Sequence, residues 1–448
     1  MPRQKSETES AALSFILTLS ASLGTFGFFA VQGILLARIL GPAGRGVFAA
    51  CVVFPQALLY VGLLGASELF AGFAAEGMHR ARLRRSAFLY GLTAGVVSLL
   101  LCVVLDIFSI PAGVQHALPL AILCALTMPF QQIRLSVLAV DHGTRNLTRY
   151  NKSRLIAAAA FPALLLLSFS FGLFEQQPSW VNNSLESPQA EGGNLSYVRS
   201  DLVLACWLFV LAHSSCLMLI QWGMTESWVG PRAVPVTAAL KKAKGLIGAW
   251  LSTELLERLD MVLILVLFAN EELMGYYATA VPIAALMIIV PNTAGIYAFN
   301  RGARKEENLT LAEVWRFMGI GLIIQTASGL ALALSLPFLI PLVYGSAFSP
   351  SVEFAWLLIP AGAFRGLLQA ADSYLRARKN PGLGLKARLC AIPILLIGSF
   401  MLAPSLGASA VPLSLTVAQM VCFTIVAAGV IHDSSRNATM EPPSVHTT

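Results

Sequence analysis

The sequence predicts an all-α polytopic membrane protein with twelve transmembrane helices in two six-helix lobes. The first observation is composition: 12% of the 448 residues are charged and the mean hydropathy is +0.73, whereas soluble domains contain about 25% charged residues. The second is a series of apolar runs long enough to span a bilayer as helices. The third is a motif that occurs twice, 231 residues apart, which indicates a duplicated bundle.

Twelve apolar runs of about 18 residues or more are each long enough to cross a hydrocarbon core of ~30 Å as a helix. They cover residues 12–39, 47–75, 86–110, 115–140, 155–174, 202–222, 245–268, 274–299, 317–342, 352–375, 389–406 and 408–431. The first run is too long for the apolar part of a signal peptide, so we expect a retained helix. The segment that follows it, beginning at Gly41, is expected to be a loop.

These runs and the basic residues predict the domain organisation and the topology. We expect an N-terminal six-helix lobe (1–222), a cytoplasmic basic linker (223–244), a C-terminal six-helix lobe (245–432) and a cytoplasmic tail (433–448). If the helices alternate, 24 of the 30 Lys and Arg residues lie on one side of the membrane, which predicts that both termini are cytoplasmic. The net charge of +7 follows from this topology and does not indicate nucleic acid as a partner.

The motif that occurs twice reads P-x4-R-x4-A-x-D-x3-R. Its members are Pro129, Arg134, Ala139, Asp141 and Arg145, and then Pro360, Arg365, Ala370, Asp372 and Arg376. Arg134 and Arg365 each precede the basic end of their helix by 11 residues, roughly 16 Å along a helix, which places both near the bilayer midplane. Charge at this depth is costly, so the pair is a candidate functional site. Guanidinium groups bind phosphate oxygens bidentately; the alternative is that each arginine pairs with a carboxylate or with freed backbone carbonyls.

The second half of the chain repeats the sequence pattern of the first half. Gly46-Val-Phe-Ala follows the first predicted helix, and Gly275-Tyr-Tyr-Ala follows the seventh at an offset of 229. Two six-helix halves with the same orientation are parallel repeats, an architecture typical of transporters that bind their substrate at the repeat interface.

The predicted helix at 245–268 contains Glu254, Glu257, Arg258 and Asp260. Glu254 and Arg258 are four residues apart and can pair along one helix face. We group Arg258 with Arg134 and Arg365 as candidate substrate-binding residues. A desolvated carboxylate readily binds a proton or Na⁺, so Glu254, Glu257 and Asp260 are candidate ion-coupling residues for an H⁺ or Na⁺ gradient. The alternative is that these acids form structural pairs only.

Other polar and sulfur-containing residues carry weaker signals. Glu68 and Asp106 lie toward the ends of predicted helices, where we expect solvated faces. The seven cysteines fall within apolar runs in a scattered, odd-numbered set, which predicts neither a disulfide framework nor a metal site. We expect no cofactor.

The segment LARILGPAGRGVF at 36–48 resembles polysaccharide flippases, of the O-antigen type, in the multidrug/oligosaccharidyl-lipid/polysaccharide exporter superfamily. Further agreement comes from Arg258-Leu-Asp, Met274-Gly-Tyr-Tyr-Ala, Leu342-Val-Tyr-Gly-Ser-Ala-Phe and Leu375-Arg-Ala-Arg-Lys-Asn-Pro. The resemblance extends over nearly all of residues 12–431. It implies two lobes around a central cavity, and a cargo of undecaprenyl-diphosphate-linked oligosaccharide that moves from the inner to the outer leaflet of the bacterial cytoplasmic membrane.

We therefore expect a transporter that works by alternating access coupled to an ion gradient, with membrane lipids and other polysaccharide-assembly membrane proteins as partners. One alternative is a cation exporter of the same fold, although cationic cargo would prefer an acidic cavity. Another is a lipid II flippase, a class that usually has two further helices. The alternative from a different class is an enzyme, a membrane polysaccharide polymerase or acyltransferase. The sequence contains no large outer loop, Gly-x-Ser-x-Gly elbow or His-Glu-x-x-His motif in support of an enzyme.

Overall fold

The computed structural model describes residues 2–144, 147–174, 195–222, 236–289, 291, 311–377 and 382–439, and every element in these ranges is helical. Seven helical spans in this part of the chain are long and apolar enough to cross a membrane. Large apolar side chains such as Leu100, Phe338 and Met401 are exposed on these helices. Extensive exposed apolar surface on helices that satisfy their own backbone hydrogen bonds is what a bilayer requires. The chain is therefore a multi-pass all-α membrane protein.

The chain folds into two compact units. The first consists of Met1–Glu254 together with Phe268–Gly275, and the second of Leu255–Leu267 together with Tyr276–Thr448. The boundary falls inside helix α8 (Val236–Phe268), which contributes residues to both units. Of the predicted linker, residues 223–235 lie outside the described part of the chain, and the remainder forms the start of α8.

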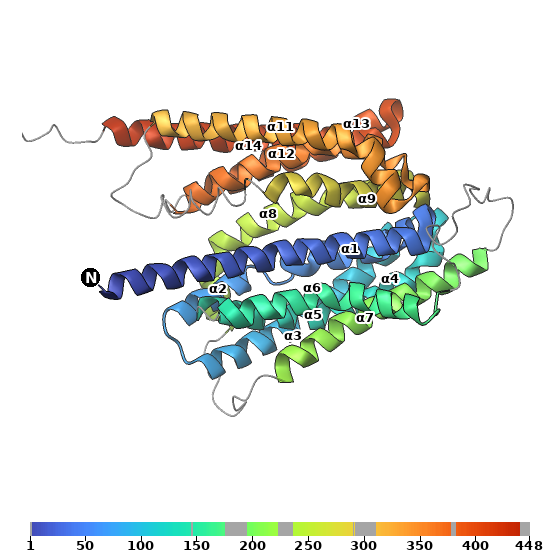
Figure 1. Ribbon diagram of the computed structural model, residues 1–448, viewed down its shortest axis with the longest axis horizontal. Coiled ribbons are helices and arrows are strands. Elements are labelled where there is room, and N and C mark those ends of the chain that lie inside the picture. Colours follow the sequence, from blue (N-terminus) through green and yellow to red (C-terminus); the bar gives the residue numbers. More distant parts are fainter. Residues whose placement is uncertain are drawn as a thin grey trace, which may run out of the picture. The chain divides into compact units, whose positions relative to one another are not determined.

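The first unit is built around two pairs of packed helices. Its helices are α1 (Pro2–Val61), α2 (Ala66–Ala75), α3 (Arg80–Ser109), α4 (Leu118–Ala125), α5 (Thr127–Gly143), α6 (Leu147–Ser170) and α7 (Leu195–Trp222). Helix α3 packs against α5, and α1 against α6 (Figure 1). A Cβ on Gly91 of α3 would lie 2.6 Å from the Cα of Ile133 on α5. Small residues thus allow close packing of the helix that contains the first motif.

Three predicted helices of the first unit differ from the structure. The helix expected at 47–75 is interrupted between Val61 and Ala66. The prediction of a loop at Gly41 is wrong. The helix continues through this segment, and only Gly41 leaves the helical conformation, with φ of 65°. Glycine adopts this left-handed conformation without strain, and Pro42 suits the first turn of the helix that follows. The single helix expected at 115–140 is divided into a 3-10 turn, α4 and α5. Pro129 has no N–H to donate to the carbonyl of Ala125, which weakens the helix at that point.

The two glycines that begin the repeated Gly-x-x-Ala segments are in contact within the first unit. A Cβ on Gly46 would lie 2.8 Å from the backbone nitrogen of Gly275, and it would collide with the backbone carbonyl of Glu271. Only glycine allows α1 and the start of α9 (Glu271–Ala284) to approach this closely. Nε2 of His116 lies 3.2 Å from Oε1 of Glu271. Partial burial raises the pKa of the Glu271 carboxyl above its ordinary value, and His116 acts in the opposite direction.

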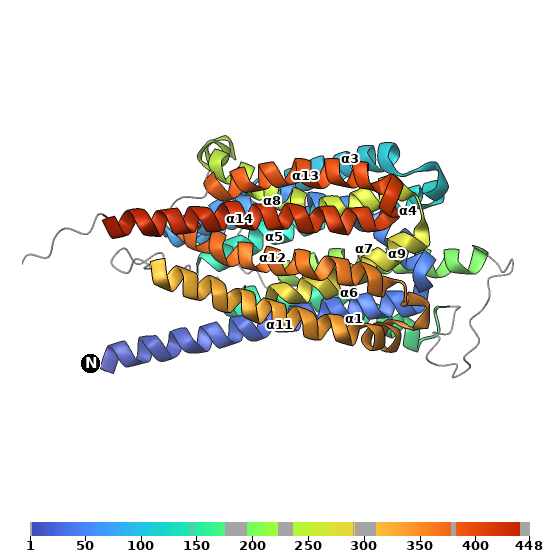
Figure 2. The ribbon, with the colours of Figure 1, turned by 90° about the horizontal axis from the view of Figure 1, so that it is seen from above.

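The second unit places the helix of the second motif among three neighbours. Its remaining helices are α11 (Leu311–Tyr344), α12 (Ser351–Ala377), α13 (Gly382–Leu406) and α14 (Ala410–Thr439). Figure 2 shows them running alongside one another, with α14 packed against α12 and α13. Nε1 of Trp356 donates a hydrogen bond to the carbonyl of Ala333 on α11 at 2.8 Å, and Oγ1 of Thr416 on α14 donates to the carbonyl of Leu357 at 3.0 Å. These contacts hold α12 in a fixed rotation between α11 and α14.

Candidate functional site

The first repeated arginine, Arg134, lies half-buried on α5. It is close enough to Tyr60 on α1 and to His213 and Cys216 on α7 for electrostatic interaction. No carboxylate among the described residues forms an ion pair or hydrogen bond with it. The predicted alternative of a carboxylate partner therefore has no support at this position. A guanidinium in this setting keeps its donors available for an anionic ligand.

The second repeated arginine, Arg365, has a carboxylate partner. Nη2 of Arg365 on α12 lies 2.6 Å from Oε2 of Glu257 on α8, and the two side chains are 32% and 22% exposed. The ion pair considered as the alternative thus forms in the second unit, whereas no described carboxylate forms one with Arg134. One candidate binding residue and one candidate coupling residue are in direct contact, a link that the sequence did not reveal.

Helix α8 carries three other charged candidate residues, Glu254, Arg258 and Asp260. Asp260 is buried, and its Oδ2 accepts a hydrogen bond from the hydroxyl of Tyr277 on α9 at 2.8 Å. Arg258 and Arg365 both lie near enough to attract the Asp260 carboxylate. Glu254 is also buried on α8. Its pairing with Arg258 stays a prediction.

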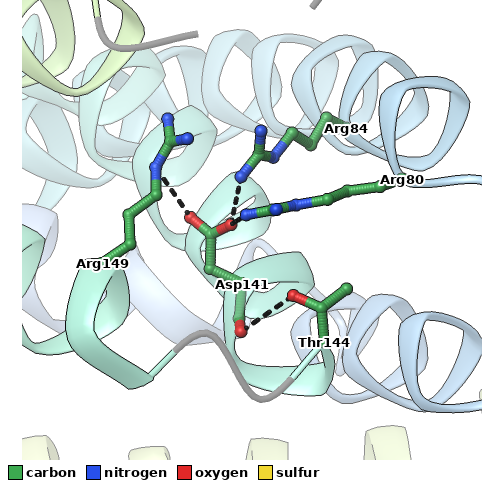
Figure 3. Close-up of polar contacts among 5 residues, drawn as sticks. All are labelled: Arg80, Arg84, Asp141, Thr144 and Arg149. Atoms are coloured by element: carbon green, nitrogen blue, oxygen red, sulfur yellow. Dashed lines mark hydrogen bonds and ion pairs between the residues drawn. The ribbon is translucent and has the colours of Figure 1, made fainter.

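The aspartate of the first motif is surrounded by arginines (Figure 3). Oδ1 of Asp141 accepts hydrogen bonds from Nη2 of Arg80, at 2.8 Å, and from Nη2 of Arg84, while Nε of Arg149 lies 3.4 Å from Oδ2. The Asp141 side chain is 0% exposed, so it needs this compensation. The hydroxyl of Thr144 donates to the Asp141 carbonyl. The side chains of Asp141, Arg80, Arg84 and Arg149 connect α5 to α3 and α6.

The aspartate of the second motif has an equivalent role with a different partner. Oδ2 of Asp372 on α12 lies 2.8 Å from Nη2 of Arg388 on α13, and both side chains are buried. Gly384 on α13 leaves no room for a Cβ beside the Asp372 carboxylate. Both aspartates are members of the sequence motif, which by itself assigns them no role. Their recurrence at one offset, next to basic helix ends, was the available signal.

The prediction of a solvated face for Asp106 is wrong. Its side chain on α3 is 0% exposed, and Cys51 on α1 and Cys124 on α4 are near enough to interact with it electrostatically. The expectation of scattered cysteines is also incomplete, since the thiols of Cys51, Cys124 and Cys206 from α1, α4 and α7 meet. The contact could not be read from residues so far apart in the chain.

Some predicted features lie outside the part of the chain that the structure describes. They are Arg145, the side chains of Glu68 and Arg376, and residues 175–194 and 292–310. Within the described ranges, no group of three or more His, Cys, Asp and Glu side chains is arranged to hold a metal ion.

The chain is a polytopic membrane protein whose fold is similar to that of solved transporters and flippases, one of them described as a member of the MOP superfamily. No protein-family model and no curated protein sequence matches the chain. The structure of lipid II flippase MurJ, in an inward closed conformation, matches with a TM-score of 0.71 at 13% identity, covering 95% of this chain and 91% of that chain.

Two MATE structures are also similar. An inward-facing multidrug resistance MATE family transporter of the MOP superfamily has a TM-score of 0.65 at 13% identity, with 95% of this chain and 99% of that chain covered. The eukaryotic MATE transporter AtDTX14 has a TM-score of 0.61 at 16% identity, with 96% and 98% covered. These neighbours are transporters or flippases and not enzymes. The superfamily fold implied by the sequence resemblance is therefore confirmed.

Proposed function

We propose that this protein is a transporter that flips undecaprenyl-diphosphate-linked oligosaccharide from the inner to the outer leaflet of the bacterial cytoplasmic membrane. The observation that carries the proposal is Arg134, a guanidinium on a membrane helix with no carboxylate partner among the described residues. A charge at the bilayer centre costs at least ~2.5 kcal/mol unless it is compensated. The diphosphate of a lipid carrier supplies the compensating charge and matches the planar guanidinium.

The contact between Arg365 and Glu257 suggests how cargo binding is coupled to a gradient. Glu257 and a diphosphate compete for the same guanidinium, whose Nη2 is 2.6 Å from the carboxylate. Protonation of Glu257 would remove its charge and free Arg365 for the cargo, and deprotonation would restore the ion pair. Asp260 and Arg258 lie in the same unit, where they set the local charge that a proton or Na⁺ experiences. Glu254 is the third coupling candidate.

The proposal includes the topology expected from the sequence. Twelve helices form two six-helix lobes, 1–222 and 245–432, with the linker 223–244, the tail 433–448 and both termini in the cytoplasm. Membrane lipids and other polysaccharide-assembly membrane proteins are the proposed partners. Similarity of the fold to MurJ and to MATE transporters supports alternating access as the mechanism.

A second candidate is export of a cationic compound. It is favoured by Glu257 and Asp260, because these carboxylates lie next to the arginines of the second unit and reduce its net positive charge. The name of the MurJ structure makes a lipid II flippase a further alternative within the flippase class.

Binding measurements on the purified full-length protein distinguish these candidates. We expect saturable binding of an undecaprenyl-diphosphate oligosaccharide that competes with inorganic diphosphate and weakens with added salt. Tetraphenylphosphonium, a lipophilic cation, should not compete. Binding of the cation together with no affinity for the diphosphate lipid would contradict the flippase and support the exporter.

A further inference from the structure

One buried carboxyl group of the first unit has no counter-charge. Asp106 lies on α3, three residues before the helix ends at Ser109, and its side chain is 0% exposed. Neither of its carboxyl oxygens has a hydrogen-bond partner among the described residues, and no basic side chain there pairs with it. Asp141 is buried to the same extent but is surrounded by three arginines. Burial disfavours the charged form of both aspartates. Arginines compensate the charge of Asp141, so Asp106 requires a different compensation.

In the described part of the chain, the titratable groups that interact electrostatically with Asp106 are thiols. Cys102 lies one turn earlier on α3, Cys51 comes from α1 and Cys124 from α4. Cys51 and Cys124 also belong to the cluster of buried apolar side chains contributed by α1, α4, α6 and α7. None of these neighbours is positively charged. In the described ranges, no group of three or more His, Cys, Asp and Glu side chains is arranged to hold a metal ion.

We propose that Asp106 is a proton-binding site of the first unit and that its carboxyl group is protonated in this conformation. Burial disfavours the charged form of a carboxyl group, and an uncompensated buried carboxylate is neutralised by taking up a proton. Uptake forms one O–H bond and changes the side-chain charge from −1 to 0. The site requires no ligand besides the proton.

A role of this site in transport rests on the proposed function. The protonation of Asp106 does not. Asp106 is close to the end of α3, so a small opening of the helix packing would admit water to the carboxyl group. Hydration favours the ionised form and releases the proton, and renewed burial requires a proton to be taken up again. The first unit would thereby have a coupling group of its own, separate from Glu254, Glu257 and Asp260.

Infrared difference spectroscopy on the full-length protein in lipid vesicles tests the proton site. The spectrum of the wild type minus that of Asp106→Asn at neutral pH should contain the carbonyl-stretch band of a protonated carboxylic acid, and this band should shift in D2O. Glu353→Gln is the matched control, because Glu353 is exposed and accepts a hydrogen bond from Ser409. Its difference spectrum should contain only the bands of an ionised carboxylate.

Two results would overturn the proposal. One is a difference spectrum for Asp106→Asn that contains ionised carboxylate bands alone. The other is failure of Asp106→Asn to fold, because asparagine resembles the neutral acid and should keep the thermal midpoint of the wild type. The measurement needs no cargo. A protein that shows the protonated band but does not bind diphosphate lipid would refute the proposed function and leave the proton site intact.

Discussion

Arg134 and Arg365 occupy equivalent positions of the two repeats, 231 residues apart, but only Arg365 has a carboxylate partner in the described part of the chain. The difference originates in α8, which places Glu257 against α12. Helix α7 instead presents His213 and Cys216 near Arg134. Substitution of the two arginines should therefore have different consequences for stability, even if both bind the same cargo.

Replacement of Arg134 by Gln should weaken binding of the diphosphate lipid at least about tenfold, because a hydrogen bond to a charged group contributes ~1.5 kcal/mol or more. Lysine at this position should restore binding only in part, since an ammonium lacks the planar fork of guanidinium. Membrane abundance should remain at the wild-type level because no carboxylate partner is orphaned. Titration of the lipid against purified variants measures the affinity. Wild-type affinity in a well-folded Arg134→Gln protein would rule out the phosphate site.

Replacement of Arg365 by Gln should also lower the thermal midpoint of the protein. The change leaves Glu257 without its partner, at a cost of about 1 kcal/mol because both side chains are partly exposed. The double variant with Glu257→Gln should recover the midpoint but not the affinity for diphosphate lipid. A double-mutant cycle on thermal unfolding in detergent measures the coupling. Additive effects would show that the ion pair does not stabilise the protein.

Neutralisation of at least one of Glu254, Glu257 and Asp260 should uncouple transport from the ion gradient while cargo binding remains measurable. Glu257→Gln is the first choice, because it removes the competitor for Arg365. Flipping of a labelled lipid in vesicles, with and without an imposed H⁺ or Na⁺ gradient, gives the readout. Glu272→Gln is the control, since Glu272 is exposed at the start of α9. If all three variants keep gradient-driven flipping, the coupling group lies elsewhere.

The sequence predicted membrane helices over much of the described chain, and it predicted that Arg134 and Arg365 lie inside helices. The depth of the two arginines in the bilayer stays a prediction. Long apolar runs have few alternatives to membrane helices, and a motif that recurs at a fixed offset identifies Arg134 and Arg365 without any structure. The breaks at Gly41 and Pro129 were harder to foresee. A single glycine or proline either bends a helix or ends it, and the packing around the residue decides which occurs.

The partners of the charged residues could not be predicted. Glu257 and Arg365 are separated by more than 100 residues in the chain, and their contact depends on the rotation of α8 and α12. Asp106 is near a helix end, which suggested a solvated face. The neighbouring Cys51 and Cys124 belong to helices whose packing the sequence pattern does not specify.

Replacement of Asp141 by Asn should destabilise the first unit by about 3 kcal/mol, because it leaves the arginines around it without a carboxylate, one of them almost fully buried. A lower thermal midpoint and reduced membrane abundance are the expected results. Glu353→Gln, which alters an exposed carboxylate, should have little effect. An Asp141→Asn protein as stable as the wild type would show that the arginines have sufficient other compensation.

Labelling of single cysteines on a cysteine-free background should confirm the twelve-helix topology. Cysteines at Arg80, Arg149, Lys242, Arg304 and Lys379 should resist an impermeant thiol reagent in intact cells. Those at Ser184 and Glu271 should react, because the basic loops are expected inside and these two positions outside. Permeabilised cells provide the control for reactivity. Reaction of the cysteine at position Arg149 in intact cells would contradict the twelve-helix topology.

The aspartates Asp141 and Asp372 show what a duplication keeps and what it exchanges. At the offset of 231, the position of Arg388 corresponds to Ala157 in the first half, and that of Arg84 corresponds to Trp315 in the second. The acid has the same position in both halves. A basic partner comes from α6 in the first half (Arg149) and from α13 in the second (Arg388), at different positions along these two helices. The buried aspartate therefore determines where this ion pair forms, while the arginine can come from a different turn of the neighbouring helix.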